Sequence, residues 1–173
     1  DFTHIGDHQF IILNELPSIP SGLAQTMLTH VERGGSLLVV PAADGDIASY
    51  NQLLQALHAP LLGAYKKGTL KVSDVNTDAA LYRGVFATKA DADMERPTTQ
   101  GHFKTTQDAT TVVETAMGYR MGDIFLSTTT YGSGTVYLLT TPLRTYLTDF
   151  VQQALFVPTL YNMALYARPV GQI

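Results

Sequence analysis

The chain has 173 residues, of which 45% are apolar and 15% are charged, and its formal net charge is −4. This length suffices for one buried core, so we expect a single domain over residues 1–173. The scattered basic residues argue against nucleic-acid binding, and the absence of cysteine excludes thiol nucleophiles, disulfides and thiolate metal sites. No apolar run reaches the length of a membrane span. Because the sequence begins with Asp and not Met, we expect it to be a fragment of a longer protein.

The first predicted elements form a strand, helix, strand unit over residues 11–46. Residues 10–13 and 36–40 are short apolar runs, which are typical of strands covered on both faces in a parallel sheet. Between them, apolar residues recur at helical spacing until the pair Gly34 and Gly35 ends the pattern. Two strands joined by one helix should be parallel neighbours, so this unit predicts an α/β fold.

The segment after this unit predicts a second helix and then a region of weak periodicity. Asp44 or Asp46 is placed to cap the second helix. Its apolar face consists of Ile47, Tyr50, Leu53, Leu54 and Leu57. Residues 65–106 suggest a strand, a short helix and a polar stretch. We interpret them as an inserted excursion over the strand ends, where such folds place recognition loops.

The last third of the chain predicts an antiparallel meander followed by a helix. Residues 110–117, 123–130 and 134–141 are rich in β-forming residues and are separated by glycine-containing turns. Residues 149–167 have a helical pattern that Pro158 should kink or divide. We therefore expect a three-layer sandwich with a mixed sheet, in which a parallel βαβ core precedes an antiparallel C-terminal meander.

The order of these elements resembles the class I glutamine amidotransferase-like fold, a flavodoxin-like sandwich whose active members carry a Cys-His-Glu glutaminase. In the segment IILNELPS, Asn14, Glu15 and Leu16 stand where active members place glycines of the oxyanion hole. In LLVVPAADGD, Ala42 and Ala43 stand where the nucleophile elbow carries cysteine. The resemblance therefore implies two landmarks that have lost their chemistry.

A third landmark is equally degenerate. In the segment LLTTPL, Thr141 and Leu143 replace the histidine and glutamate of a His-Pro-Glu triplet, and only the proline is kept. A glutaminase needs an activated thiol beside a base and an oxyanion hole. We therefore expect no glutaminase activity, no catalytic residues at these positions and no cofactor.

Three segments also resemble the amidotransferase-like domain of Bat-type (BatA-like) aerotolerance membrane proteins. They are NELPSIPSGLAQTMLTHVERGGSLLVVP, YGSGTVYLLTTPL and ALFVPTLYNMAL. The resemblance implies a domain on the periplasmic side of a bacterial inner membrane, anchored by segments outside this chain. It also implies protein partners, with a von Willebrand factor A domain in the same or a partner chain as one of them.

Carboxylates at the strand ends are the candidates for a residual site. Glu15, Asp44 and Asp46, with Asn14, follow two strands whose carboxyl ends should meet at one edge of the sheet, where open α/β sheets bind ligands. Acidic groups there can coordinate a cation or act as general acid and base. The alternative is that an aspartate caps the helix and Glu15 faces water, and we favour this alternative.

Two further groups have a catalytic or metal-binding interpretation that we do not favour. His4, Asp7 and His8 have a spacing suited to a divalent metal, but a frayed chain end rarely holds ligands rigidly, so no metal site is predicted. Ser133 lies in a GSG segment between two apolar runs, which indicates a hairpin turn and not a nucleophile elbow.

The remaining histidines and two tyrosines receive structural interpretations. His30 and His58 lie near helix C-termini, where a cationic side chain is favoured, and His102 is predicted in a loop. Tyr161 and Tyr166 are predicted on the core face of the last helix.

Two functions follow from these observations. The first is a non-catalytic binding or scaffolding domain that keeps the amidotransferase-like fold within a membrane-anchored protein. The second is a hydrolase, or a small-ligand or metal-binding domain, that uses the carboxylates at the strand ends.

Overall fold

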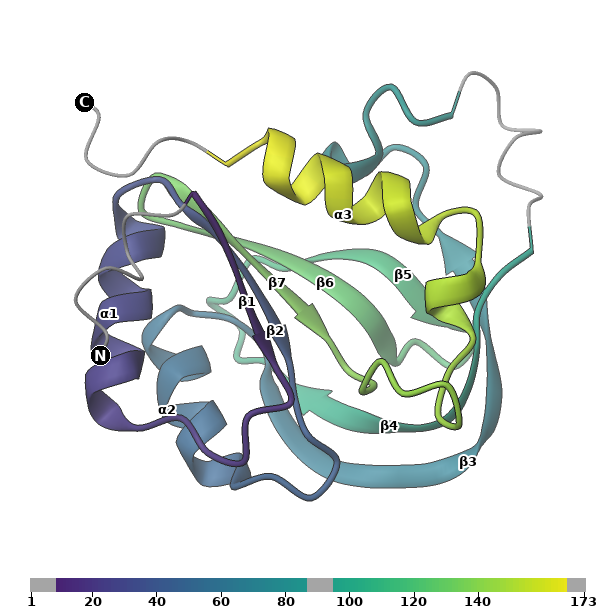
Figure 1. Ribbon diagram of the computed structural model, residues 1–173, viewed down its shortest axis with the longest axis horizontal. Coiled ribbons are helices and arrows are strands. Elements are labelled where there is room, and N and C mark those ends of the chain that lie inside the picture. Colours follow the sequence, from purple (N-terminus) through teal and green to yellow (C-terminus); the bar gives the residue numbers. More distant parts are fainter. Residues whose placement is uncertain (1–8, 87–94, 168–173) are drawn as a thin grey trace.

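The computed structural model describes residues 9–86 and 95–167 of the chain. Seven strands form one mixed sheet in the order β1-β2-β7-β6-β5-β3-β4. Helices α1 (Ser21–Glu32) and α2 (Ile47–Ala56) lie on one face of the sheet, and α3 (Phe156–Leu165) lies on the other (Figure 1). The predicted three-layer sandwich with a mixed sheet is confirmed.

The parallel part of the sheet contains β1 (Phe10–Asn14), β2 (Ser36–Val40) and β7 (Gly134–Leu139). Strand β2 pairs in parallel with both of the others and is buried along its whole length. Strand β1 lies at the edge of the sheet, and its Ile12 is 44% exposed. The prediction of burial on both faces therefore holds for β2 and fails for β1. As an edge strand, β1 has a strand neighbour on one side, and the face that carries Ile12 is incompletely covered.

Local signals explain where the first two helices begin and end. Helix α1 starts after Pro20, which has extended backbone angles and makes no side-chain cap, and it stops before Gly34, whose φ of 114° favours glycine. Helix α2 starts after Asp46, whose carboxylate accepts a hydrogen bond from the amide of Ser49 at 3.4 Å. Asp46 is thus the predicted N-cap.

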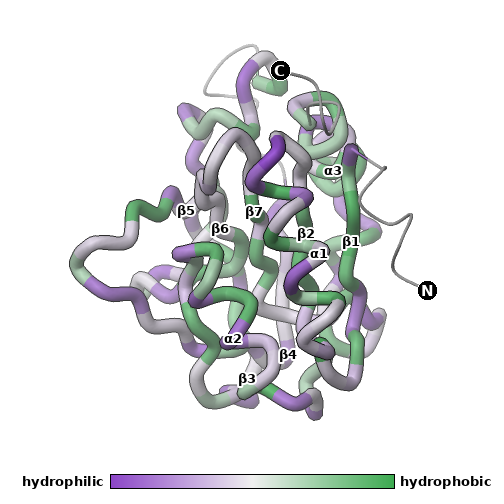
Figure 2. The backbone as a smooth tube through the Cα atoms, turned by 90° about the vertical axis from the view of Figure 1, so that its left-hand side faces the viewer, coloured by the Kyte–Doolittle hydropathy of each residue, from purple (hydrophilic) through white to green (hydrophobic). Residues whose placement is uncertain are grey.

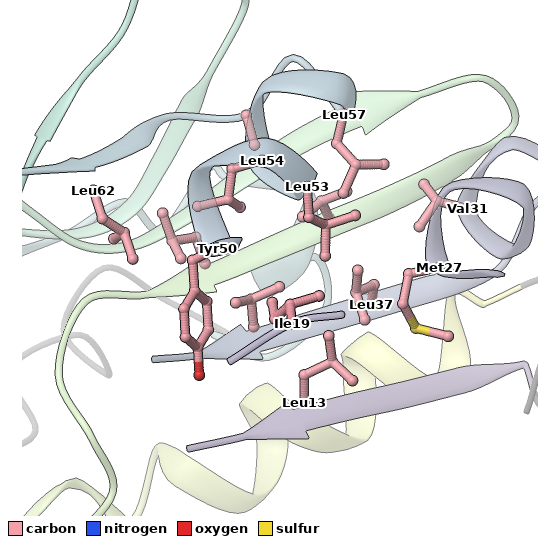
Figure 3. Packing of buried hydrophobic residues seen from close by; sticks show 14 of the residues in the cluster. Leu13, Ile19, Met27, Val31, Leu37, Tyr50, Leu53, Leu54, Leu57 and Leu62 are labelled. Carbon is pink, nitrogen blue, oxygen red and sulfur yellow. The ribbon is translucent and has the colours of Figure 1, made fainter. Parts of the chain in front are cut away.

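The first of two hydrophobic clusters lies between the sheet and helices α1 and α2. Figure 3 shows leucines of α2 packed against Val31, Met27 and the β2 residue Leu37. Tyr50 stands at one end of this cluster, with its hydroxyl directed away from the leucines (Figure 3). Figure 2 shows hydrophobic residues along much of β1 and β2. Burial of these side chains supplies the main driving force for folding of this half.

Residues 65–106 contribute to the sheet. Strand β3 (Leu61–Val75) pairs antiparallel with β4 (Thr98–Thr106) through its first two thirds and with β5 through its end. The predicted short helix is a 3₁₀ turn at Ala80–Tyr82. Residues 87–94, in the polar stretch, lie outside the described part of the chain. The described parts of this region extend the sheet beyond β5.

Strands β5 (Glu114–Tyr119), β6 (Ile124–Tyr131) and β7 form the predicted antiparallel meander. Their α3-facing side chains build the second hydrophobic cluster. Within it, the rings of Phe125 and Phe150 meet edge to face at 5.2 Å, and those of Phe150 and Phe156 at 5.1 Å. Such aromatic pairs favour edge-to-face geometry, so this chain of rings fixes α3 against the sheet.

The last predicted helix is divided in two. A 3₁₀ turn at Phe150–Gln152 is followed by α3, which begins only at Phe156. Pro158 lies in the first turn of α3, where a missing amide hydrogen leaves no helical bond unmade. Over residues 9–86 and 95–167, no helix has the length and apolar character needed to span a bilayer.

Candidate functional site

The parallel strands β1, β2 and β7 are adjacent, so the loops that follow them meet at one end of the sheet. We call residues 14–17, 41–46 and 140–144 the strand-end loops. Tyr50 of α2 joins two of them: its hydroxyl donates to the Leu16 carbonyl at 2.5 Å and accepts from the Ala42 amide at 3.4 Å. Burial raises the pKa of the Tyr50 hydroxyl, so it stays protonated and able to donate at neutral pH.

Glu15 is held by an ion pair. Its backbone is left-handed, with a φ of 54°, and its amide donates to the carbonyl of Val40 at 2.7 Å. The Nε of Arg144 lies 3.0 Å from both carboxylate oxygens of Glu15. Hydrogen bonding to Glu15 raises the pKa of Arg144. The pair connects the loop after β1 with the loop after β7, and it neutralises one of the three carboxylates predicted as a base or metal ligand.

The other acidic candidates have separate positions. Asp46 caps α2, as described above, while Asp44 and Asn14 are exposed. In the described part of the chain, no three histidine, aspartate or glutamate side chains form a group suited to a metal ion. Ligand binding by Asn14, Glu15, Asp44 and Asp46 stays a prediction.

The positions that the resemblance compares with catalytic residues, in the loops after β2 and β7, make packing and backbone contacts. Ala42 is buried and Ala43 is exposed in the loop after β2. Thr141 is fully buried and donates to the carbonyl of Gly101 in β4 at 3.0 Å. Leu143 packs against the hydrophobic cluster on the α3 face. The hydroxyl of Thr141 thus fixes β4 across the end of β7.

Beside Thr141 lies a buried polar cluster that sequence reasoning missed. The Tyr119 hydroxyl is 2.8 Å from the Thr99 hydroxyl, and the ring of His102 packs on the Tyr119 ring at 4.5 Å. Burial raises the pKa of Tyr119 in spite of its hydrogen bonds to Thr99 and Thr141, which lower it. The prediction that His102 lies in a loop is wrong, because it is a fully buried residue of β4.

His102 pairs with Asp123. Its Nε2 is 2.7 Å from Oδ2 of Asp123, and the Lys104 ammonium donates to both carboxylate oxygens at 3.0 Å. Burial raises the pKa of Asp123, but the hydrogen bonds from His102 and Lys104 outweigh it, so the pKa lies below its ordinary value. The Nδ1 of His102 has no hydrogen-bond partner in the described structure. This histidine and aspartate therefore activate no nucleophile among the described residues.

The other predicted histidine roles have mixed outcomes. The Nε2 of His30 is 2.9 Å from the carbonyl of Ser36 in β2, and the ring is buried. The prediction that His30 caps its own helix is therefore wrong, because it ties α1 to the sheet. His58 follows α2 with a left-handed φ of 58°, and its ring stacks on Tyr131 at 5.8 Å.

The two remaining predictions concern Ser133 and the group of His4, Asp7 and His8. Ser133 lies in the turn between β6 and β7, as predicted, and its amide donates to the carbonyl of Glu32 at 3.1 Å. His4, Asp7 and His8 lie outside the described residues.

Helix α3 has apolar side chains on two faces: Phe156, Leu160 and Met163 pack against the second hydrophobic cluster, and a second apolar stripe is exposed. Its apolar residues Val157, Tyr161 and Leu165 are 70%, 64% and 57% exposed. Its buried side includes the polar residues Thr159 and Asn162. The prediction that Tyr161 belongs to the core face is therefore wrong: helical periodicity alone cannot tell which apolar stripe faces inward when two are present.

Hydrogen bonds from the two buried polar residues add to the apolar contacts of the inner face. The Thr159 hydroxyl donates to the Leu155 carbonyl at 2.7 Å and lies 3.1 Å from the Tyr82 hydroxyl. The amide nitrogen of Asn162 donates to the carbonyl of Leu81 at 2.7 Å. These buried polar contacts help to fix the rotation of α3 and leave the apolar stripe outside. Tyr166, 38% exposed, also lies outside the predicted core face.

The roles of two residues escaped sequence reasoning. Tyr50 was recognised as a member of an apolar helix face, but its hydroxyl contacts depend on tertiary geometry. Arg144 carried a readable signal, because it is a cation placed directly after the third strand that ends at this site. A basic residue there is a natural counter-ion for Glu15.

The chain has a flavodoxin-like, class I glutamine amidotransferase-like fold. No protein-family model and no curated protein sequence matches the chain. Solved structures do match it. The cytoplasmic protein STM1381 from Salmonella typhimurium LT2 has a TM-score of 0.72 and 15% identity, over 96% of this chain and 75% of that one.

Two further structures support the same fold. The cytoplasmic protein STM3548 from Salmonella typhimurium has a TM-score of 0.70 and 12% identity, over 96% of this chain and 74% of that one. A ThuA-like protein from Bacteroides uniformis has a TM-score of 0.62 and 11% identity, over 95% of this chain and 71% of that one. Identities this low establish the fold and leave the function open.

The comparisons contradict two expectations. These three structural neighbours are cytoplasmic or ThuA-like proteins and none is a Bat-type protein, so the narrower assignment to Bat-type aerotolerance proteins is wrong. The periplasmic, membrane-anchored location rested on that assignment and falls with it. The wider amidotransferase-like resemblance, which rested on the order of the elements, is retained.

Proposed function

We propose that this chain is a non-catalytic domain that binds a protein partner through α3. The observation that carries the proposal is the exposed apolar stripe of α3, which consists of Val157, Tyr161 and Leu165. An exposed apolar stripe on a well-packed helix costs free energy in water, and such stripes mark interaction surfaces.

The charge pattern defines the partner. The chain carries a net charge of −4, yet the segment 150–167 contains no charged side chain. A partner that buries this segment therefore meets no charged side chain within it. The matching surface is apolar and uncharged, with the shape of a groove that accepts residues at positions i, i+4 and i+8 of a helix.

The strand-end loops support the non-catalytic part of the proposal. Glu15 is neutralised by Arg144, Asp46 caps a helix, and the hydroxyl of Tyr50 closes the space between two loops. These contacts use the groups that a hydrolase would need free. The chain has no cysteine for a glutaminase.

Site-specific photo-crosslinking tests the surface. A photoreactive phenylalanine is placed at Tyr161, and in a matched control at Tyr146, which is 72% exposed on the loop after β7. We expect a protein adduct, identified by mass spectrometry, from position 161, and its loss when Val157 and Leu165 are changed to aspartate. A cross-link to a second copy identifies the chain itself as the partner. Equal adducts from both positions, or none from position 161, would contradict the proposal.

A glutaminase assay tests the proposal that the domain is non-catalytic. Purified chain incubated with glutamine should release no more glutamate than a buffer control. Release that scales with protein concentration would overturn the non-catalytic assignment and leave the α3 surface to be judged separately by cross-linking.

A further inference from the structure

Four hydroxyl-bearing side chains stand together on the α3 face of the sheet, far along β6 and β7 from the strand-end loops. Thr128 lies opposite Tyr137, and Thr130 lies opposite Thr135, as two cross-strand pairs of the antiparallel ladder. Residues two apart on a strand share a face, and Tyr137 belongs to the cluster on the α3 side. We call these four residues the hydroxyl square.

A pocket lies over the hydroxyl square. Its volume is about 150 Å³, and Ala80, Leu81 and Arg83, from the 3₁₀ turn and the residues after it, form one wall. Tyr166, just after α3, forms another. The Tyr166 hydroxyl already donates to the carbonyl of Arg83 at 3.2 Å, which joins the two walls. The pocket is therefore a built feature between two covering elements and the sheet.

Two hydroxyls in this pocket lack partners. Tyr137 is 2% exposed, and its hydroxyl makes no hydrogen bond to a described residue. The Oγ1 of its cross-strand neighbour Thr128 is buried and also unbonded in the described structure. Buried polar groups in folded proteins are nearly always hydrogen-bonded. The Thr128 and Tyr137 hydroxyls line one pocket and bond to no described residue, so both can serve a ligand held there.

The lining sets the chemistry of that ligand. Arg83 is the charged residue of the lining, and no carboxylate lines the pocket. The hydroxyls can all donate, and burial raises the pKa of Tyr137 to about 12, which keeps its proton in place. Ala80 and Leu81 offer an apolar surface to a short carbon chain. A cation with several donors suits an anion, and the apolar wall favours an organic acid over phosphate.

We propose that the pocket over the hydroxyl square binds a small organic carboxylate. Its oxygens accept hydrogen bonds from Tyr137 and Thr128, Arg83 supplies the countercharge, and its carbon chain contacts Leu81. This site is separate from the strand-end loops and from the apolar stripe of α3, so it does not depend on the proposed function.

The test is a titration of the ¹⁵N-labelled chain followed by NMR. The probes are acetate, propionate and butyrate, with propionamide as the neutral isostere and inorganic phosphate as the inorganic anion. We expect a carboxylate to shift amide signals of Thr128, Tyr137 and Leu81 in a saturable way, and propionamide and phosphate to bind at least tenfold more weakly. Saturable binding of phosphate as tight as that of every carboxylate, or no saturable shift with any carboxylate, would overturn the proposal.

Matched variants locate the binding. Tyr137→Phe keeps the ring and removes the hydroxyl, and Arg83→Gln removes the charge; each should weaken carboxylate binding at least fivefold. Tyr146→Phe and Arg120→Gln make the same chemical changes outside the pocket and should change it less than twofold. Equal affinities in Tyr137→Phe, Arg83→Gln and the unmodified chain would place the binding elsewhere and refute the assignment. The fingerprint spectrum of each variant verifies that it is folded.

Discussion

Tyr50 and Tyr137 are both buried tyrosines whose pKa is raised by burial, and they lie on opposite faces of the same sheet. The Tyr50 hydroxyl bonds to two strand-end loops, whereas the Tyr137 hydroxyl bonds to no described residue. At the strand-end loops the buried hydroxyl is used to hold two loops together. In the pocket over the hydroxyl square, the hydroxyls of Tyr137 and Thr128 bond to no described residue and can still bond to a ligand.

The largest expected effect follows from removing the hydroxyl that closes the strand-end loops. Tyr50→Phe leaves the partly buried carbonyl of Leu16 without its donor, and we expect the free energy of unfolding to fall by about 1–3 kcal/mol. Urea denaturation followed by circular dichroism measures it. No loss of stability would mean that the loops are held without Tyr50.

The acidic partner of His102 should have a smaller, pH-dependent effect. Asp123→Asn keeps an oxygen acceptor but loses the charge, so we expect a loss of about 1 kcal/mol at neutral pH. The pKa of Asp123 is lowered by folding, so its stabilisation is complete above about pH 4, the range of an unfolded aspartate, and is lost as the pH falls through the folded value.

Denaturation midpoints between about pH 2 and pH 7 measure this dependence. The unmodified chain should lose more stability on acidification than the Asp123→Asn variant. Parallel curves for the two proteins would show that Asp123 gains nothing from His102 and Lys104.

A third change tests the ion pair between Arg144 and Glu15, at the surface of the strand-end loops. Arg144→Gln breaks the ion pair with Glu15, but Arg144 is 57% exposed, so solvent screens the interaction. We expect a slight loss of stability that disappears in about 1 M salt, where charges are screened within a few ångströms. Thermal denaturation at low and high salt checks it, and a large, salt-independent loss would assign Arg144 a packing role.

Much of the fold could be predicted from the sequence because its signals are local. The apolar runs of β1 and β2, the cap at Asp46 and the glycine-containing turns of the meander each depend on neighbouring residues. Long-range pairing was harder to predict: the sequence pattern of β3 does not show that it joins β4 at one end and β5 at the other.

The sequence allowed a prediction of which residues stand in the strand-end loops, but not of the contacts that they make. The resemblance alone led us to expect no catalytic residue at Ala42, Ala43 and Thr141, and that expectation stays a prediction. The closure by Tyr50, in contrast, depends on distances between segments more than thirty residues apart in the chain, as the hydrogen bond to Leu16 shows. The orientation of α3 was misjudged because its inward face is set in part by two polar hydrogen bonds, from Thr159 and Asn162, that hydropathy does not register.

The most direct test of the contrast between the two regions is urea denaturation of Tyr137→Phe and Tyr50→Phe side by side, without added carboxylate. Because the Tyr137 hydroxyl has no described partner to lose, we predict that Tyr137→Phe changes the free energy of unfolding by less than about 0.5 kcal/mol, while Tyr50→Phe loses several times more. A loss in Tyr137→Phe as large as that in Tyr50→Phe would show that both hydroxyls serve the fold, and it would contradict the account.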